Sequence, residues 1–188
     1  KLGERKEPEK KMTYRVLGKT GIRMPVITMG VMNTDNPNLV RAALNAGMFH
    51  LDTAQTYQKG TNEAMIGEVL KGRPRDSFAI STKARLPTDR NTGLISPEAT
   101  EDDFTKKIDT SLKRLGLDYI DIYHHHGIQV REAALHEPVL KALEKAKKAG
   151  KIRFIGITTH RNEPEIIQAA IDSKVYDVVL PAYNFRQQ

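Results

Sequence analysis

The stretch that decides the fold is "DYIDIYHHHG", residues 118–127, which sets three consecutive histidines at the end of an apolar run. Side chains of a strand alternate between its two faces, so Ile120 and Ile122 fall on one face and Tyr119 and Tyr123 on the other. A strand that is apolar on both faces is typical of a parallel sheet covered by helices. The stretch therefore predicts a buried parallel strand whose carboxyl end carries polar side chains.

The same kind of apolar run recurs along the chain and alternates with amphipathic stretches. Six runs predict strands: "PVITMGVM" (25–32), "MFHLDTA" (48–54), "SFAISTKA" (77–84), "YIDIYHHH" (119–126), "KIRFIGITT" (151–159) and "YDVVLPAYN" (176–184). Five stretches between them, bounded by capping residues, predict helices. Their expected ranges are 36–47, 61–72, 96–116, about 138–149 and a last helix from Asn162.

This alternation predicts an α/β protein with right-handed crossovers, for which two architectures compete. An open doubly wound sheet that binds a dinucleotide has a G-x-G-x-x-G turn after its first strand, whereas "MGVMNTDNPN" (29–38) has a single glycine. A closed barrel places functional side chains at the carboxyl ends of several strands. Such polar residues stand here at Asp52, Lys83, His126, Thr158 and Thr159. The sequence therefore favours a (β/α)8 TIM barrel.

Composition narrows the function classes. The chain has 188 residues, no cysteine and a formal net charge of +7. This length suits one domain, and the lack of cysteine excludes disulfides, thiolate metal sites and cysteine nucleophiles. Residues 1–24 hold eight Lys or Arg against three Glu, a charge of +5, which leaves +2 for residues 25–188. We therefore expect a basic N-terminal tail over residues 1–13, a folded domain over residues 14–188 and no nucleic-acid partner.

The apolar runs also bear on membranes and targeting. No run reaches the roughly 18 to 20 residues that cross a bilayer, and the N-terminal "KLGERKEPEKK" has no apolar segment behind it. We expect no membrane partner and a cytoplasmic location by default. Because the chain begins at Lys1 without an initiator Met, the native N-terminus and export after removal of an upstream leader stay open.

Four motifs together resemble the aldo-keto reductases, in the same order and at similar spacing. They are "HLDTAQTY" (50–57), "ISTKA" (80–84), "DYIDIYHHH" (118–126) and "GKIRFIGIT" (150–158). The segment "YRVLGKTGIRMPVITMGVM" (14–32) is similar to that family's N-terminal hairpin followed by its first barrel strand. The resemblance covers nearly all of the chain from about Tyr14 onward.

The resemblance implies an NAD(P)H-dependent oxidoreductase that reduces aldehydes or ketones to alcohols. Its catalytic residues would be Asp52, Tyr57, Lys83 and His126. A nicotinamide supplies the hydride, and a side chain must protonate the carbonyl oxygen. Tyrosine is a weak acid, with an ordinary pKa of about 10, unless nearby positive charge stabilises its anion. Tyr57 would therefore be the proton donor, Lys83 would assist it, Asp52 would hold Lys83, and His126 would orient the carbonyl.

The resemblance also implies NADPH (NADP+) as the cofactor and a small-molecule carbonyl compound as the substrate. The implied cofactor-binding residues are Gly30, Asp52, Thr158 and Thr159. Many members of the family carry Ser-Asn where this chain has Thr158-Thr159, and Gln where it has Leu180, so the nicotinamide contacts are expected to differ in detail. Family habit favours NADPH over NADH, and the sequence does not specify which carbonyl compound reacts.

Side-chain alternation separates the three histidines. His124 and His126 share one face of the strand, and His125 points to the other. Alignment with the family places the catalytic histidine at His126, so we expect His124 to be a hydrogen-bonded core residue and His125 to pack against a helix. A metal site would need to draw on His50, His124, His126 or His160 across strands. We favour the reductase over a metal-dependent barrel hydrolase and expect no metal site.

The chain reaches "PAYNFRQQ" (181–188) just past its sixth strand, whereas a complete barrel has eight strands and about 250 residues. We therefore expect a fragment of a longer barrel, with an incomplete cofactor site and little activity on its own. Its open strand edges would favour self-association. A non-catalytic redox-sensing or scaffold subunit with the same fold is the alternative function.

Overall fold

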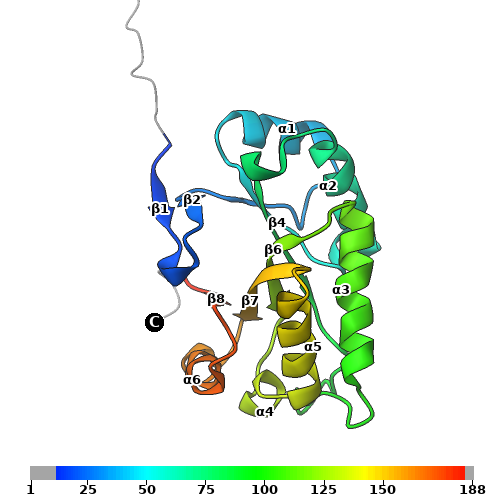
Figure 1. Cartoon of the computed structure of the whole chain (residues 1–188). Coiled ribbons are helices and arrows are strands. Elements are labelled where there is room, and N and C mark those ends of the chain that lie inside the picture. Colours follow the sequence, from blue (N-terminus) through cyan, green and yellow to red (C-terminus); the bar gives the residue numbers. More distant parts are fainter. Residues whose placement is uncertain (1–11, 185–188) are drawn as a thin grey trace, which may run out of the picture.

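A computed structural model describes residues 12–184, so the predicted basic tail lies, up to Lys11, outside the described residues (Figure 1). Strands β1 (Tyr14–Val16) and β2 (Arg23–Pro25) pair antiparallel around the 3-10 turn η1 (Gly18–Thr20). This pairing confirms the predicted N-terminal hairpin. Among the helices of residues 12–184, none combines the length and the apolar character that crossing a membrane requires.

The main sheet has six parallel strands whose order in space is their order along the chain. They are β3 (Met29–Gly30), β4 (His50–Asp52), β5 (Ala79–Ala84), β6 (Ile120–His125), β7 (Ile152–Thr159) and β8 (Val178–Pro181). A doubly wound sheet reverses its strand order at a switch point. This sheet instead curls in one direction into a half-barrel, which confirms the predicted barrel architecture and the six predicted strands (Figure 1).

Helices connect the strands and lie on the outer side of the curl (Figure 1). The five predicted helices are α1 (Pro37–Asn45), α2 (Asn62–Leu70), α3 (Glu101–Leu115), α5 (Glu137–Lys148) and α6 (Glu163–Ser173). Besides η1, three short turns of helix were not predicted: α4 (Arg131–Ala134), η2 (Tyr57–Gly60) and η3 (Arg75–Ser77). Their apolar pattern is too short to distinguish them from loops.

Two predicted elements begin four or more residues later than expected, beyond the shifts of one to three residues at other element ends. The strand expected over residues 25–32 shortens to Met29–Gly30, because Pro25 belongs to the hairpin and the exposed Val26 and Ile27 join the two sheets.

The helix expected from Ser96 begins instead at Glu101, after a capping box. The Thr100 hydroxyl accepts the Asp103 N–H at 3.2 Å, and the Asp103 carboxylate accepts the Thr100 N–H at 3.0 Å. These two bonds satisfy N–H groups of the first turn, which no Ser96 cap could do five residues earlier.

The core has two parts. The larger lies between the sheet and the helices and includes Leu51, Ile80, Phe104 and Leu143, all fully buried. The smaller lies inside the curl, where hairpin residues pack against the sheet. Its members are Ile22, Ala79 and Ile122, with Leu17, Met24, Phe154 and Val178 packed around them. The hairpin therefore fills the curl near the amino-terminal ends of the strands and leaves the carboxyl ends for polar side chains.

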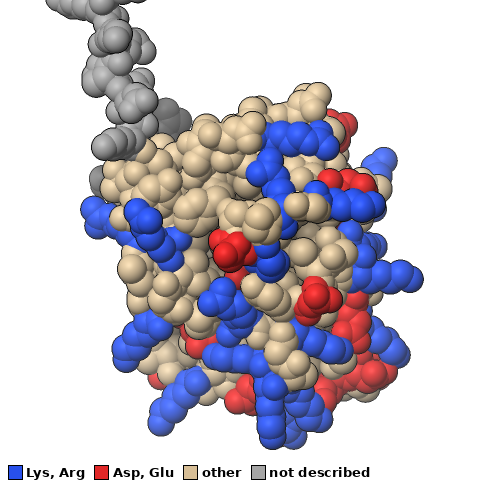
Figure 2. All heavy atoms as spheres, turned by 45° about the horizontal axis from the view of Figure 1, so that its top comes forward, with Lys and Arg blue, Asp and Glu red and all other residues tan. Residues whose placement is uncertain are grey.

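Lysine and arginine side chains cover much of the face shown in Figure 2, with aspartate and glutamate side chains between them. On that face acidic side chains therefore offset part of the positive charge.

Gly67 sets the distance between α2 and α3, which generates a stability prediction. A Cβ atom at Gly67 would lie 2.7 Å from the Leu115 carbonyl oxygen and 2.9 Å from that of Arg114. Replacing glycine by alanine inside a helix normally stabilises it by about 1 kcal/mol. Here we expect the overlap with backbone atoms to reverse the sign, so that Gly67→Ala lowers the free energy of unfolding by about 1 to 3 kcal/mol in urea denaturation.

The matched control is Glu68→Ala, one residue along the same helix, because the Glu68 side chain is 76% exposed and its ion pair within residues 12–184 is with the equally exposed Lys71. We expect this change to move the free energy of unfolding by no more than about 0.5 kcal/mol. A Gly67→Ala protein more stable than the parent would show that the two helices do not approach so closely.

Candidate active site

Three of the four predicted catalytic residues meet at the Lys83 side chain. Lys83 lies near the carboxyl end of β5 and is 3% exposed. Its Nζ donates to Asp52 Oδ2 at 2.6 Å, to the Thr53 carbonyl oxygen at 2.8 Å and to Tyr57 Oη at 3.2 Å. Parallel pairing of β4 with β5, in which Asp52 lies opposite Ser81, brings these residues to the same edge of the sheet.

The fourth residue, His126, follows β6 and borders the same cavity. Its backbone N–H donates to the Ala84 carbonyl oxygen at 2.9 Å, which places it beside the end of β5. Its ring centroid lies 6.1 Å from that of Tyr57, and the two ring planes meet at 79°. The cavity has a volume of about 220 Å³ and is lined by Asp52, Tyr57, Lys83, His126, Thr158, His160 and residues 180–182.

The Tyr57 loop between β4 and α2 is anchored at both sides of the tyrosine. The Gln55 side-chain amide donates to Ser111 Oγ of α3 at 3.0 Å. After the tyrosine, the Gln58 side-chain amide donates to the Met32 carbonyl oxygen at 2.8 Å. Gln58 and Lys59 have left-handed backbone, at φ values of 49° and 55°. Such a conformation costs about 1 to 2 kcal/mol for a residue with a side chain, so the anchors fix Tyr57 in a backbone that would otherwise relax.

One carboxylate oxygen of Asp52 is free to accept a hydrogen bond from a bound ligand. Its Oδ1 is buried and has no hydrogen-bond partner within residues 12–184. Burial raises the pKa of the Asp52 carboxyl, and the neighbouring Lys83 lowers it in part. Gly30 lies opposite Asp52 in the sheet, and a Cβ atom built at Gly30 has open space for 4 Å around it. An unsatisfied buried acceptor beside open space fits a hydroxyl donor of the kind that a nucleotide ribose provides.

The two threonines after β7 behave differently. Thr158 borders the cavity, and its Oγ1 accepts the Gly127 N–H at 2.8 Å, which leaves its own hydroxyl proton able to donate to a ligand. Thr159 is not among the lining residues, and its Oγ1 accepts the Arg161 N–H at 3.2 Å. Binding of the cofactor by Gly30, Asp52, Thr158 and Thr159 stays a prediction, and the Thr159 hydroxyl is occupied within its own loop.

The three consecutive histidines lie on the sides that alternation predicts. His125 packs against α3, with its ring centroid 5.6 Å from that of Phe104, so the predicted helix contact is confirmed. His124 lies inside the curl, where a Cβ atom at Gly156 would be 2.1 Å from its Nδ1. It is a buried core residue as predicted, although its Nδ1 has no hydrogen-bond partner within the described part of the chain.

His126 is held in its neutral form. Burial lowers its pKa to about 4, with further contributions from the positive charges of Lys83 and Arg85. Near pH 7 the ring therefore presents one N–H donor and is not an acid. Tyr57 contributes a phenolic hydroxyl to the same cavity.

Over residues 12–184 no three His, Asp or Glu side chains come together in a way that could hold a metal ion. His50 bonds instead to Ser81 Oγ at 2.6 Å, inside the curl.

The sequence patterns did not predict two groups at the site. Thr53 contributes its backbone carbonyl oxygen, which no residue type reveals. Arg85 lies near His126, and the signal that could have found it is its position two residues after Lys83, on the same face of the extended chain.

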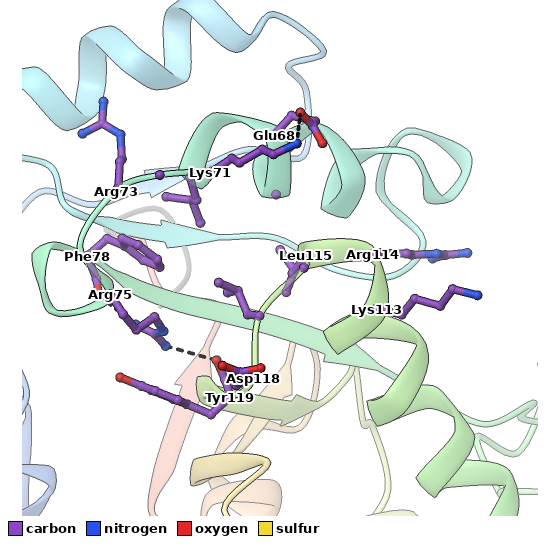
Figure 3. Close-up of a pocket in the computed structure, with 15 residues that line it drawn as sticks. Glu68, Lys71, Arg73, Arg75, Phe78, Lys113, Arg114, Leu115, Asp118 and Tyr119 are labelled. Atoms are coloured by element: carbon purple, nitrogen blue, oxygen red, sulfur yellow. Dashed lines mark hydrogen bonds and ion pairs between the residues drawn. The ribbon is translucent and has the colours of Figure 1, made fainter.

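A second cavity, of about 450 Å³, lies at the other end of the strands (Figure 3). It is lined by the ends of α2 and α3 and by residues that precede β5 and β6, among them Phe78 and Tyr119. The Arg75 guanidinium stacks on the Tyr119 ring at 3.8 Å and donates to Asp121 at 2.6 Å. These contacts give Arg75 a structural role at this cavity. In barrels of this kind, residues at the amino-terminal ends of the strands contribute to stability.

Comparison with known proteins identifies the family. The sequence model of the aldo/keto reductase family matches residues 28–186. The chain belongs to the aldo/keto reductase family. Curated relatives include L-glyceraldehyde 3-phosphate reductase of Escherichia coli, 32% identical over 174 residues that cover 86% of this chain and 49% of that protein. L-galactose dehydrogenase of Arabidopsis thaliana is 33% identical over 161 residues, which cover 79% of this chain and 49% of that protein.

Solved structures agree on the fold. An aldo-keto reductase of Bacillus halodurans in its holo form gives a TM-score of 0.74 at 27% identity, over 92% of this chain and 58% of that one. An aldo-keto reductase of Klebsiella pneumoniae in complex with NADPH gives 0.67 at 24% identity, over 85% of this chain and 54% of that one. This chain spans about half the length of the curated relatives it matches. The predicted family and barrel fold are confirmed.

Buried neutral histidines generate a prediction about acid stability. Burial lowers the pKa of His125 to about 3, from an ordinary value of 6.5. Between these two pH values the unfolded chain binds a proton that the folded chain excludes. The stability contributed by His125 is therefore complete above about pH 6.5 and is lost as pH falls, by up to about 1.4 kcal/mol per pH unit. We expect His125→Phe to reduce the slope of unfolding free energy against pH by that amount in urea titrations at pH 7, 6 and 5.

The control is His160→Gln, because His160 is exposed. It should leave the slope of the parent protein unchanged. Equal slopes for the parent and His125→Phe would mean that His125 takes up its proton without unfolding.

Proposed function

We propose that this sequence carries the catalytic centre of an NADPH-dependent reductase that converts aldehydes or ketones to alcohols, with Tyr57 as the proton donor. The observation that carries the proposal is the contact of one buried Lys83 Nζ with both Asp52 Oδ2 and Tyr57 Oη, in a cavity that His126 also lines. Membership of the aldo/keto reductase family supports it.

Proton transfer falls to Tyr57. When bound, the nicotinamide supplies a hydride to the carbonyl carbon. Negative charge then develops on the carbonyl oxygen, and Tyr57 Oη gives its proton to that atom. The Lys83 ammonium at 3.2 Å stabilises the charge left on the tyrosine oxygen. Asp52 Oδ2 and the Thr53 carbonyl oxygen keep the ammonium from turning away.

Carbonyl orientation falls to His126. As a neutral imidazole it donates one N–H to the carbonyl oxygen and does not compete with Tyr57 for protonation of that oxygen.

Residues beside this centre would contact the cofactor. Asp52 Oδ1 would accept a ribose hydroxyl, Thr158 Oγ1 would donate to the carboxamide, and Gly30 leaves space for the close approach.

The substrate that we propose is a small hydroxylated carbonyl compound. The proteins similar to this chain include an L-glyceraldehyde 3-phosphate reductase, an L-galactose dehydrogenase and a 6-dehydroglucose reductase. The compounds in these names all have a hydroxylated carbon chain. A cavity of about 220 Å³ bordered by hydroxyl and imidazole groups suits such a compound.

The two edge strands of the sheet indicate what the active protein must contain in addition. Within residues 12–184, β3 and β8 each pair with a single neighbouring strand, and Leu180 of β8 is 43% exposed. Open edges of this kind attract further strands. We propose that the active protein covers both edges with additional strands of the same barrel and that these complete the cofactor site. Activity is therefore to be measured on the intact protein that contains this sequence.

Tyr57→Phe tests the proposed acid. Removing the hydroxyl while keeping the ring should lower kcat for a test aldehyde by about 10²- to 10⁴-fold, the usual size of general-acid catalysis. The dissociation constant for NADPH, read from the fluorescence of the cofactor, should change by less than about twofold, because the hydroxyl interacts with the reacting oxygen.

The matched control is Tyr119→Phe, at the other end of the strands, where the ring stacks with Arg75 (Figure 3). It should leave kcat unchanged. Full activity in the Tyr57→Phe protein would exclude Tyr57 as the proton donor and would favour a scaffold role for the fold.

A further inference from the structure

Arg85 lies near His126 of the catalytic cavity and forms no ion pair within residues 12–184. It follows β5 two residues after Lys83, so both side chains are directed to the same side of the extended chain. Its Nη1 would lie 3.8 Å from a Cβ atom at Gly127, the residue after His126. Within residues 12–184 no carboxylate forms an ion pair with Arg85, and the side chain is exposed.

A hollow of about 380 Å³ lies beside this guanidinium. Arg85 and Arg90 both border it, together with polar groups of Thr88 and Gln129. No ion pair engages Arg90 among the described residues either. Two guanidinium groups therefore face one polar hollow with their hydrogen-bonding capacity unused by the protein.

The acid that borders the hollow is already engaged. Asp89 Oδ1 accepts the N–H groups of Asn91 at 2.9 Å and Thr92 at 2.7 Å, and also the Thr92 hydroxyl at 3.0 Å. These bonds hold the carboxylate within its own turn and lower its pKa. Asp89 stays charged, and the two arginines against this one aspartate leave the hollow with a net positive charge.

The hollow and the catalytic cavity are neighbours along the chain. His126 borders the cavity, and Gly127 borders the hollow. The Gly127 backbone, at a φ of 67°, is fixed by its N–H bond to Thr158 Oγ1. The hollow therefore begins one residue from His126, and a substrate that extends from His126 past Gly127 would meet Arg85.

We propose that this hollow binds an anionic group of the carbonyl substrate, a phosphate or a carboxylate, with Arg85 as its main ligand and Arg90 as the second. The inference rests on the proposed reductase function and narrows its substrate class. Guanidinium groups match the geometry of both anions through paired N–H donors. A side chain that was merely solvated would show no preference between a charged substrate and its neutral counterpart.

The test compares matched pairs of aldehydes in the intact protein with NADPH. Glyceraldehyde 3-phosphate against glyceraldehyde tests the phosphate source, and 4-carboxybenzaldehyde against benzaldehyde tests the carboxylate source. The measured quantity is the ratio of kcat/KM for the charged member to that for the neutral member. We expect Arg85→Ala to lower this ratio by about 10- to 100-fold in the pair that matches the natural anion, and Arg85→Lys to restore part of it.

The matched control is Arg73→Ala, which removes the same charge at the other end of the strands, where Arg73 is drawn in Figure 3. It should leave both ratios at the parent value. A ratio that is the same in the parent and in Arg85→Ala, for both pairs and with active enzyme, would overturn the inference while the reductase function stands.

A binding measurement covers the case in which neither pair is reduced. Inorganic phosphate and acetate are titrated into the protein while the amide resonance of Gly127 is followed by NMR. Saturable shifts that Arg85→Ala abolishes support the anion site even if the proposed reductase function fails. No shift with either anion overturns the site.

Discussion

The buried charge of Lys83 is the constraint on which the rest of the site depends. A lysine with 3% of its surface exposed is costly unless its charge is paired and its donors are used. Its three close contacts are a carboxylate, a carbonyl oxygen and a phenol oxygen, which match the three donors of an ammonium group. The first two contacts are made by Asp52 at the end of β4 and by Thr53 directly after it, so they hold the ammonium group in place. The third contact then holds the Tyr57 hydroxyl in one position.

Parallel strands supply that arrangement without any special device. In a barrel every strand runs in the same direction, so residues separated by dozens of positions arrive at one edge. At the amino-terminal ends of the strands, hairpin residues such as Ile22 pack inside the curl. Arg75 stacks there between the rings of Phe78 and Tyr119. The chain thus keeps its apolar closure at the amino-terminal ends and its reactive groups at the carboxyl ends.

Sequence patterns predicted most of this because the strands are short, apolar and separated by capped helices. Asp52, Tyr57, Lys83 and His126 could be selected from motifs, and alternation alone divided His124, His125 and His126 correctly between the interior and the helices. Errors arose where contacts are non-local or made by the backbone. Val26 and Ile27 have the composition of a strand, yet they join two sheets, and nothing in their neighbours shows it. The Thr53 carbonyl oxygen and the unpaired state of Arg85 are likewise visible only once the strands are in register.

Positive charge near His126 connects catalysis with substrate choice. Lys83 and Arg85 both lower the pKa of His126, after the larger effect of burial. Lys83 is compensated by Asp52, whereas Arg85 has no carboxylate partner within the described residues. An anion bound at Arg85 would cancel part of the field on His126, and burial alone would still disfavour the imidazolium. His126 therefore remains a neutral hydrogen-bond donor with or without a charged substrate. A site built in this way can bind an anion close to its orienting residue without converting that residue into a second acid that competes with Tyr57.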